Sequence, residues 1–234
     1  MIKYKVAHHQ LIRSVLENFN ADFFYKNTIL FGGGTRIALE ISEYRESIDV
    51  DFLCPDQASY RSVREQVTSH SLGELVKEDF NYVRDIAFDR YGTRTFIDIN
   101  DTKIKIEFVS FENYQLVKDE GKLFPLPYID RTSCFYTKLL ANADRCLSPP
   151  FKDIYDLLAM SDAWGGIPQE AFAKAEMHYG SSIRKQLRRS LEDIINNEIK
   201  YLKAAESMLI DKSYSLRLVR QTAKDLLNGL DVNS

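Results

Sequence analysis

Residues 27–53 constrain the possible folds more than any other part of the chain, because the pattern of apolar, glycine and polar residues changes several times within them. Residues 27–31 (NTILF) form a short apolar run that ends in the glycines at 32–34, and helix-forming residues resume at Thr35. Residues 47–53 (SIDVDFL) then alternate between polar and apolar side chains as far as Phe52. The stretch predicts a strand, a glycine turn, a helix and a second strand, which is typical of an α/β unit.

The alternation in SIDVDFL predicts a strand with one buried face and one acidic face. Ile48, Val50 and Phe52 share the first face, and Asp49, Asp51 and Leu53 share the second. Two carboxylates that are roughly 6.5–7 Å apart repel each other unless a positive charge lies between them. An isolated D-x-D is more often a solvent-facing strand, but the glycine turn just upstream favours a divalent-cation site that can hold two ions.

A third carboxylate is expected from a β-hairpin further along the chain. Residues 94–100 (RTFIDIN) and 103–110 (KIKIEFVS) are two alternating runs on either side of a turn. Glu107 alternates away from the apolar residues of its run, and we prefer it as the third metal ligand because its strand can lie beside the aspartate strand. Asp98 on the other run is the alternative.

The remaining pattern predicts an α+β protein with two domains. Helical spacing is present over residues 6–19 and 59–76, and the apolar residues from Ser133 to Leu230 also recur at helical intervals, with no further convincing strand. We expect an α/β domain with a mixed sheet over residues 1–128, followed by a helical domain over residues 129–234.

Composition excludes several classes of protein. No apolar run approaches the ~18 residues needed to cross a bilayer, and the N-terminus lacks the apolar stretch of a secretory signal, so we expect a cytoplasmic protein. Cys54, Cys134 and Cys146 fit neither a disulfide framework nor a zinc site. His8 and His9 adjoin on a predicted helix and are interpreted as surface or packing residues.

Two blocks of residues resemble the AbiEii/AbiGii toxin family of the DNA polymerase beta-type nucleotidyltransferases. The first block has the family's Gly-Gly-Thr turn and Arg-x-Ser-x-Asp-x-Asp motif, as Gly33, Gly34, Thr35, Arg45, Ser47, Asp49 and Asp51. The second has its Lys…Ala…Arg…Lys-Asp-x-x-Asp-Leu segment, as Lys138, Ala141, Arg145, Lys152, Asp153, Asp156 and Leu157. The resemblance covers roughly residues 27–160.

The resemblance implies an enzyme that transfers a nucleoside monophosphate from an NTP to an acceptor. The acceptor is expected to be RNA, such as the 3′ end of tRNA, and the protein is expected to be the toxin of a bacterial toxin–antitoxin or phage-defence system with a separately encoded antitoxin. Transfer to a protein or small-molecule hydroxyl is an alternative. A further alternative is an inactive nucleotidyltransferase fold that serves as a binding module.

The resemblance also implies roles for particular residues. Asp49, Asp51 and Glu107 would hold two Mg²⁺ ions, and Lys138 would supply a positive charge to the phosphates. Further residues of the NTP site would be Gly33, Gly34, Thr35, Arg45, Ser47, Asp153 and Asp156. Two alternatives are purely structural: an i,i+4 pair between Lys152 and Asp156, and a solvated basic face at residues 184–189 rather than an RNA contact.

Overall fold

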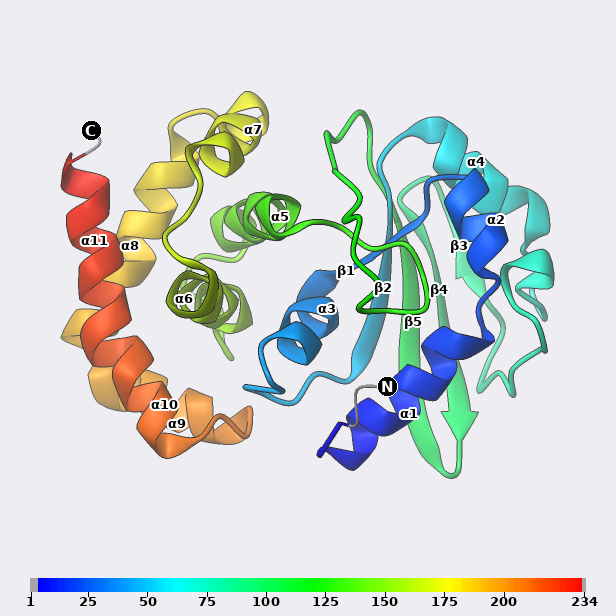
Figure 1. Cartoon of the computed structure of the whole chain (residues 1–234), viewed down its shortest axis with the longest axis horizontal. Coiled ribbons are helices and arrows are strands. Elements are labelled where there is room, and N and C mark those ends of the chain that lie inside the picture. Colours follow the sequence, from blue (N-terminus) through cyan, green and yellow to red (C-terminus); the bar gives the residue numbers. More distant parts are fainter. Residues whose placement is uncertain (1–3, 233–234) are drawn as a thin grey trace. The chain divides into compact units, whose positions relative to one another are not determined.

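The computed structural model describes residues 4–232 of the chain, with side chains described through Leu230. The chain divides into two compact units, which Figure 1 colours by sequence. The first unit extends through Glu40 and resumes over Ser47–Asp130, and the second combines Ile41–Glu46 with the described residues from Arg131 onward. The chain therefore enters the second unit briefly, just before the predicted aspartate strand, and then returns to the first.

A five-stranded mixed sheet with the order β1-β2-β5-β4-β3 runs through the first unit. The strands are β1 (Leu30–Gly32), β2 (Asp49–Cys54), β3 (Ala87–Phe88), β4 (Gly92–Ile99) and β5 (Thr102–Ser110). β2 and β5 are parallel, and the other neighbouring pairs are antiparallel. The predicted hairpin is confirmed as β4 and β5. It turns at Asn100 and Asp101, whose φ angles of 52° and 62° suit a two-residue hairpin turn.

One face of this sheet forms the core of the first unit. The predicted alternation of β2 is confirmed for Val50 and Phe52, which are fully buried, as are Ile104, Ile106 and Phe108 of β5. Ile48 was expected on the same face, but it precedes the strand and is exposed. The helical elements of this unit are α1 (Ala7–Asn18), α2 (Ala21–Lys26), α3 (Gly33–Glu40), α4 (Gln57–Gln66) and the 3₁₀ turn η1 (Gly73–Leu75).

The helix expected over residues 59–76 is wrong in its second half, because α4 ends at Gln66. The Thr68 side chain supplies the reason. Its Oγ1 accepts a hydrogen bond from the backbone N–H of Ser71 at 3.1 Å. A threonine that bonds to a nearby backbone group in this way stabilises a turn in place of further helix.

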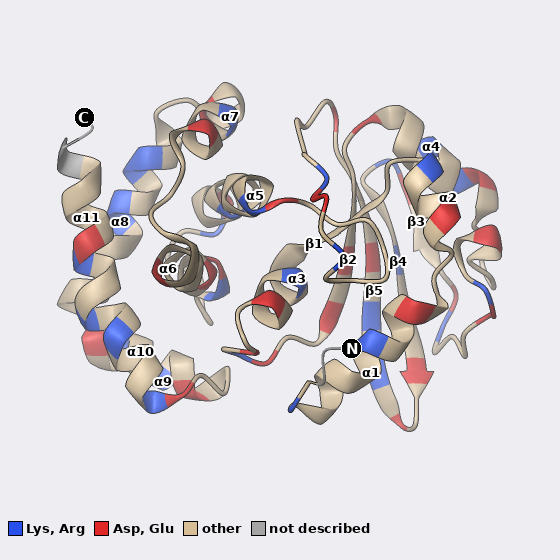
Figure 2. Cartoon of the chain, in the orientation of Figure 1, with Lys and Arg blue, Asp and Glu red and all other residues tan. Residues whose placement is uncertain are grey.

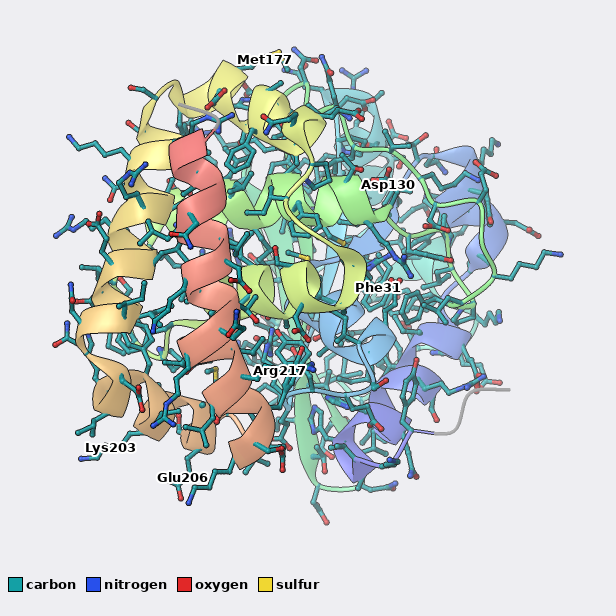
Figure 3. All side chains as sticks on the ribbon, turned by 60° about the vertical axis from the view of Figure 1, so that its left-hand side comes forward. Phe31, Asp130, Met177, Lys203, Glu206 and Arg217 are labelled. Atoms are coloured by element: carbon teal, nitrogen blue, oxygen red, sulfur yellow. The ribbon has the colours of Figure 1, made fainter. Side chains whose placement is uncertain are left out.

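The second unit contains the predicted C-terminal helices. They are α5 (Arg131–Asp144), α6 (Lys152–Trp164), α7 (Gln169–Tyr179), α8 (Ser182–Asn196), α9 (Glu198–Ser207), α10 (Lys212–Arg217), the π-helical segment η2 (Leu218–Thr222) and α11 (Ala223–Val232). Helix α8 buries the apolar stripe Ile183, Leu187, Leu191 and Ile194, in agreement with the expected spacing. On α9, the side chains of Lys203 and Glu206 point outward (Figure 3).

The fold class is therefore α+β, as the sequence predicted. A mixed sheet with its own helices occupies the first unit, and in the described part of the second unit every regular element is helical. Within residues 4–232, no helix is both long enough and apolar enough to span a bilayer.

Candidate active site

Asp49 and Asp51 lie on the polar face of β2, on the side opposite to the buried Val50 and Phe52. Both aspartates are half-buried. Residues two apart on a strand are separated by roughly 6.5–7 Å, so their like charges repel each other. A hard divalent cation prefers oxygen ligands and removes this repulsion when it binds. The two side chains therefore have the chemistry and the spacing of a cation site.

The parallel pairing of β2 with β5 adds Glu107 to the same face. In the ladder, Asp51 is paired with Glu107 and Asp49 with Lys105. Neighbouring strands are about 4.8 Å apart, and paired residues of a ladder project to the same side of the sheet. The backbone therefore brings three carboxylates to one region of the polar face. Figure 2 shows acidic and basic residues on neighbouring strands of this sheet.

Two cations hold the Glu107 carboxylate. Arg94 Nε donates to Oε1 at 2.7 Å, and Lys105 Nζ donates to Oε2 at 2.5 Å. Partial burial opposes ionisation of Glu107, but these charged hydrogen bonds outweigh it and lower its pKa. Among residues 4–232, no three His, Cys, Asp or Glu side chains converge as a metal ion requires. A metal ion at Asp51 would have to compete with Arg94 and Lys105 for Glu107.

Asp98, the alternative third carboxylate, lies at the far end of the hairpin. It is paired with Lys103, and its Oδ1 accepts a hydrogen bond from the backbone N–H of Asp101 at 3.1 Å. The residue of β4 that is paired with Glu107 is Arg94, four positions from Asp98. Four residues of strand span about 13 Å, so Asp98 is far from the aspartates of β2 and Glu107 is the better candidate.

The glycine turn lies directly against Asp51. Helix α3 begins at Gly33 rather than at the expected Thr35, so Gly33 and Gly34 form its first turn. Gly33 has a φ of +69°, and a Cβ atom at this position would come within 2.8 Å of Asp51 Cγ. Only glycine avoids both the strain and the collision. The positive end of the α3 dipole therefore lies beside a carboxylate of β2.

Thr35 and Ser47 join the start of α3 to the start of β2. Both are buried, and their hydroxyl oxygens are 2.8 Å apart. The Thr35 hydroxyl donates to the backbone carbonyl of Asp49. A hydroxyl has one proton to donate, so Ser47 is the donor between the two side chains. In this arrangement the two residues fix the backbone of Asp49, whereas the sequence suggested a contact with the triphosphate.

In the second unit, Asp156 is the centre of a buried ion network. Its side chain has no exposed area. Arg45 Nε donates to Oδ1 at 2.8 Å, Lys138 Nζ lies 2.6 Å from Oδ2, and the Tyr44 hydroxyl also donates to Oδ1. Burial opposes ionisation, but the two cations prevail and lower the pKa of Asp156 to about 2. The suggested i,i+4 pair with Lys152 is wrong, because Asp156 is bound by Arg45 and Lys138 while Lys152 is exposed.

Asp153 extends the network to the surface of the second unit. Lys138 Nζ donates to its Oδ1 at 3.0 Å, and Arg145 Nε donates to its Oδ2 at 2.9 Å. The pKa of Lys138 is raised, since attraction to Asp156 and Asp153 outweighs the effect of burial. The sequence suggested that Lys138 contacts phosphate, and the structure shows its ammonium group between two carboxylates of its own unit.

The predicted site residues thus fall in two groups. The first unit contains Gly33, Gly34, Thr35, Ser47, Asp49, Asp51 and Glu107, and the second contains Arg45, Lys138, Asp153 and Asp156. A comparison with known families shows which family the chain matches. A family model described as "Nucleotidyl transferase AbiEii toxin, Type IV TA system" matches residues 14–225. The chain belongs to the AbiEii family. This AbiEii protein is a nucleotidyltransferase, and the match extends past Trp164 into the helices that the resemblance left uncovered.

Solved structures share the fold of this AbiEii protein. A proposed nucleotidyltransferase from H. pylori has a TM-score of 0.55 and 13% identity, with 97% of this chain and 96% of that chain covered. JHP933 from Helicobacter pylori has a TM-score of 0.54 and 14% identity, with 97% and 93% covered. At these identities the likeness establishes the fold alone. The comparison with curated proteins found no match.

Sequence reasoning missed two histidines that contact the segment leading into Asp49. His9 is fully buried, and its Nε2 accepts a hydrogen bond from the backbone N–H of Ser47 at 3.1 Å. His8 Nε2 lies 3.2 Å from the backbone carbonyl of Ile48. Helix α1 therefore contacts the backbone that leads into Asp49. No signal in the sequence connects these histidines to a segment about forty residues away, because the contact depends on tertiary packing.

Proposed function

We propose that this AbiEii protein transfers a nucleoside monophosphate from an NTP to the 3′ end of an RNA, such as tRNA, in a Mg²⁺-dependent reaction. The observation that supports the proposal is the position of Asp49 and Asp51. They share one face of β2, Gly33 at the start of α3 lies against Asp51, and Glu107 is paired with Asp51 on the next strand. The type IV family adds the expectation of a toxin that a separately encoded antitoxin controls.

The reaction needs a nucleophile, a leaving group and charge neutralisation. The acceptor hydroxyl oxygen forms a bond to the α-phosphorus of the NTP, the bond from that phosphorus to the bridging oxygen breaks, and pyrophosphate leaves while the hydroxyl proton is released. Mg²⁺ bound at the site would lower the pKa of the attacking hydroxyl and neutralise charge on the triphosphate. Asp49 and Asp51 would hold two ions, with Glu107 as third ligand once it exchanges its present partners.

The residues around the carboxylates position the substrate and the ligands. The first N–H groups of α3, at Gly33 and Gly34, have no partner within the helix and can bind the triphosphate. Thr35 and Ser47 keep the backbone of Asp49 in place through their mutual hydrogen bond. We also propose Arg45, Lys138, Asp153 and Asp156 as NTP-site residues, with Arg45 two positions before Ser47 in the chain.

Labelled nucleotides provide the test. The purified protein is incubated with Mg²⁺, each NTP labelled at the α-phosphate, and total RNA or total protein. We expect label in RNA with the wild type and none with Asp51→Asn. Asp101→Asn at the hairpin turn is the matched control, since asparagine tolerates its left-handed φ of 62°, and it should label RNA normally. Label in protein alone, or equal labelling by Asp51→Asn, would overturn the proposal.

A growth experiment tests the toxin role separately. Expression of the wild type without an antitoxin is expected to arrest a bacterial host, and Asp51→Asn is expected to relieve the arrest. Equal toxicity of the two proteins at matched expression would point to aggregation or binding instead of catalysis.

A further inference from the structure

The polar face of the sheet continues from the carboxylates across β5 and β4. Arg94 is paired with Glu107, and Phe96 is paired with Lys105. Both β4 residues therefore project to the same side as Asp51, since paired residues share a face. The next neighbours of the proposed metal site on this face are thus two cations and an aromatic ring.

These side chains are accessible enough to meet a ligand. The Arg94 side chain is 36% exposed and the Lys105 side chain is 30% exposed. Phe96 is half-buried, although it lies on the polar face of its strand. The exposed Arg84 places its guanidinium carbon 4.5 Å from the centre of the Phe96 ring. Single-strand binding sites combine aromatic rings, on which bases stack, with arginines and lysines that contact the phosphates.

We propose that this surface, formed by Arg84, Arg94, Phe96 and Lys105, binds the single-stranded 3′ end of the acceptor RNA. The proposal rests on the function proposed above and names how the acceptor is held. The terminal hydroxyl lies at Asp51 and Glu107, the phosphates next to it contact Lys105 and Arg94, and a base further from the end stacks on Phe96 and Arg84. An unpaired strand is required, because the bases of a duplex have no free face to stack on an aromatic ring.

The basic residues of α8 are a weaker candidate for this role. Arg184 Nε lies 2.6 Å from Glu176 Oε1, and its guanidinium group covers the ring of Phe172 at 4.1 Å. Arg184 belongs to the second unit, whereas Asp51 and Glu107 of the proposed metal site belong to the first. Among the described residues, neither Lys185 nor Arg189 makes a cation–ring contact like the one between Arg84 and Phe96. We therefore assign the acceptor to the sheet.

A second arginine–phenylalanine pair, Arg64 and Phe88, lies on the opposite face of the sheet and supplies matched controls. Phe88 is 41% exposed, and the Arg64 guanidinium carbon lies 3.6 Å from the centre of its ring. Phe88 is paired with Thr93, which is fully buried, so this ring lies on the side away from Asp51. The two arginine–phenylalanine pairs have the same chemistry and differ in which face of the sheet they occupy.

Direct binding is the first measurement. Anisotropy of a fluorescent single-stranded RNA, without NTP, gives the Kd for the wild type and for Phe96→Ala, Arg84→Ala, Phe88→Ala and Arg64→Ala. We expect Phe96→Ala to weaken binding on the order of tenfold. Arg84→Ala should reduce the slope of log Kd against log salt by roughly one if it contacts a phosphate, or weaken binding at all salt concentrations if it only stacks. The two control variants should bind within about twofold of the wild type.

Two results would overturn the assignment of RNA binding to this surface. One is equal loss of affinity in Phe96→Ala and Phe88→Ala, and the other is binding of a blunt RNA duplex as tight as that of the single strand. Circular dichroism and thermal unfolding confirm that the variants are folded. If Phe96→Ala does not fold, Phe96→Leu replaces it, because leucine fills similar space without a ring for stacking.

Kinetics separate this proposal from the proposed function. In Phe96→Ala we expect the KM for RNA to rise by about the same factor as the Kd, with the KM for NTP unchanged. A wild type that transfers label to RNA, together with an unaffected Phe96→Ala, would overturn the surface alone. A wild type that binds single-stranded RNA through Phe96 but transfers nothing would support the surface and overturn the transfer function.

Discussion

Arg45 and Asp156 are 111 residues apart in the chain and form a buried ion pair, with Nε and Oδ1 at 2.8 Å. Lys138 shares the same carboxylate. Ion pairs at this depth contribute little as a net sum, because burial opposes both charges. Removal of one partner has a much larger effect, since it leaves the other charge buried and unpaired. The network therefore makes the stability of the second unit depend on each of its members.

Asp156→Asn tests this dependence. We expect the free energy of unfolding to fall by about 3–5 kcal/mol, because Arg45 and Lys138 lose the carboxylate that neutralises them. Asp144→Asn is the control, since Asp144 is an exposed residue of α5 and should change stability by less than about 0.5 kcal/mol. Urea unfolding of both variants gives the values, and equal stabilities would contradict the assigned role.

The stability of the wild type should depend on pH through Asp156. Its folded pKa is about 2, below the ~3.9 of aspartate in an unfolded chain. The resulting stabilisation, about 2–3 kcal/mol, is complete above about pH 5 and is lost as the pH falls through 2. The stability gap between the wild type and Asp156→Asn should thus narrow at low pH. Unfolding curves of both proteins at several pH values measure the gap, and a constant gap would refute the assignment.

Glu107 and Asp98 are distinguished by one pair of variants. Glu107→Gln is expected to reduce nucleotidyl transfer by at least about a hundredfold, because it removes a proposed metal ligand charge beside Asp51. Asp98 lies on the same face at the far end of the hairpin. The variant Asp98→Asn should therefore retain wild-type turnover. The measurement is transfer rate against Mg²⁺ concentration. A reversed order of effects would assign the third carboxylate to Asp98.

Gly33→Ala should damage the site through Asp51. The added Cβ meets the Asp51 carboxyl group, and the φ of +69° is strained for alanine. We expect a loss of roughly 1–3 kcal/mol in stability together with a strong loss of transfer. Gly166→Ala is the control, because a Cβ there meets nothing within 4 Å. Thermal unfolding and the transfer assay are measured on the same samples. Equal stability and equal activity of the two variants would contradict the prediction.

Lys138→Ala separates a structural role from a role at the phosphates. We expect a loss of stability of about 3–5 kcal/mol, because Asp156 loses a cation at full burial. A contact with phosphate would in addition lower kcat/KM of the folded enzyme by ten- to two-hundred-fold, the equivalent of about 1.5–3 kcal/mol. Lys152→Ala, at an exposed lysine of α6, is the control. Kinetics of the folded fraction across NTP concentrations decide between a structural role alone and both roles.

Local pattern was enough to predict the strand of Asp49 and Asp51 and the hairpin that carries Glu107. Alternation fixes which residues share a face, and the α+β class follows from the order of the predicted elements. Alternation alone does not give the pairing of Asp51 with Glu107, because strand order depends on long-range packing. The helix predicted over residues 59–76 was too long for a local reason. The Thr68 side chain forms a hydrogen bond that stabilises a turn, and apolar spacing does not reveal this bond.

The ion network could not be derived from the sequence in its observed form. Arg45 lies between two segments of the first unit in the sequence, yet it belongs to the second unit. A prediction with a single domain boundary assigns every residue before that boundary to the first unit. It therefore misses the short segment Ile41–Glu46, which belongs to the second unit. The same limit applies to His9, whose bond to Ser47 links positions 38 residues apart.

The excursion of Ile41–Glu46 into the helical unit has a consequence during protein synthesis. Arg45 leaves the ribosome 111 residues ahead of Asp156. Until then its guanidinium group lacks the carboxylate that neutralises it in the finished protein, and the segment that leads to Asp49 is not yet anchored. A truncated polypeptide that ends within α5 contains the whole sheet but cannot form this anchor. The buried pair of Arg45 and Asp156 therefore forms only after translation is well past the first unit.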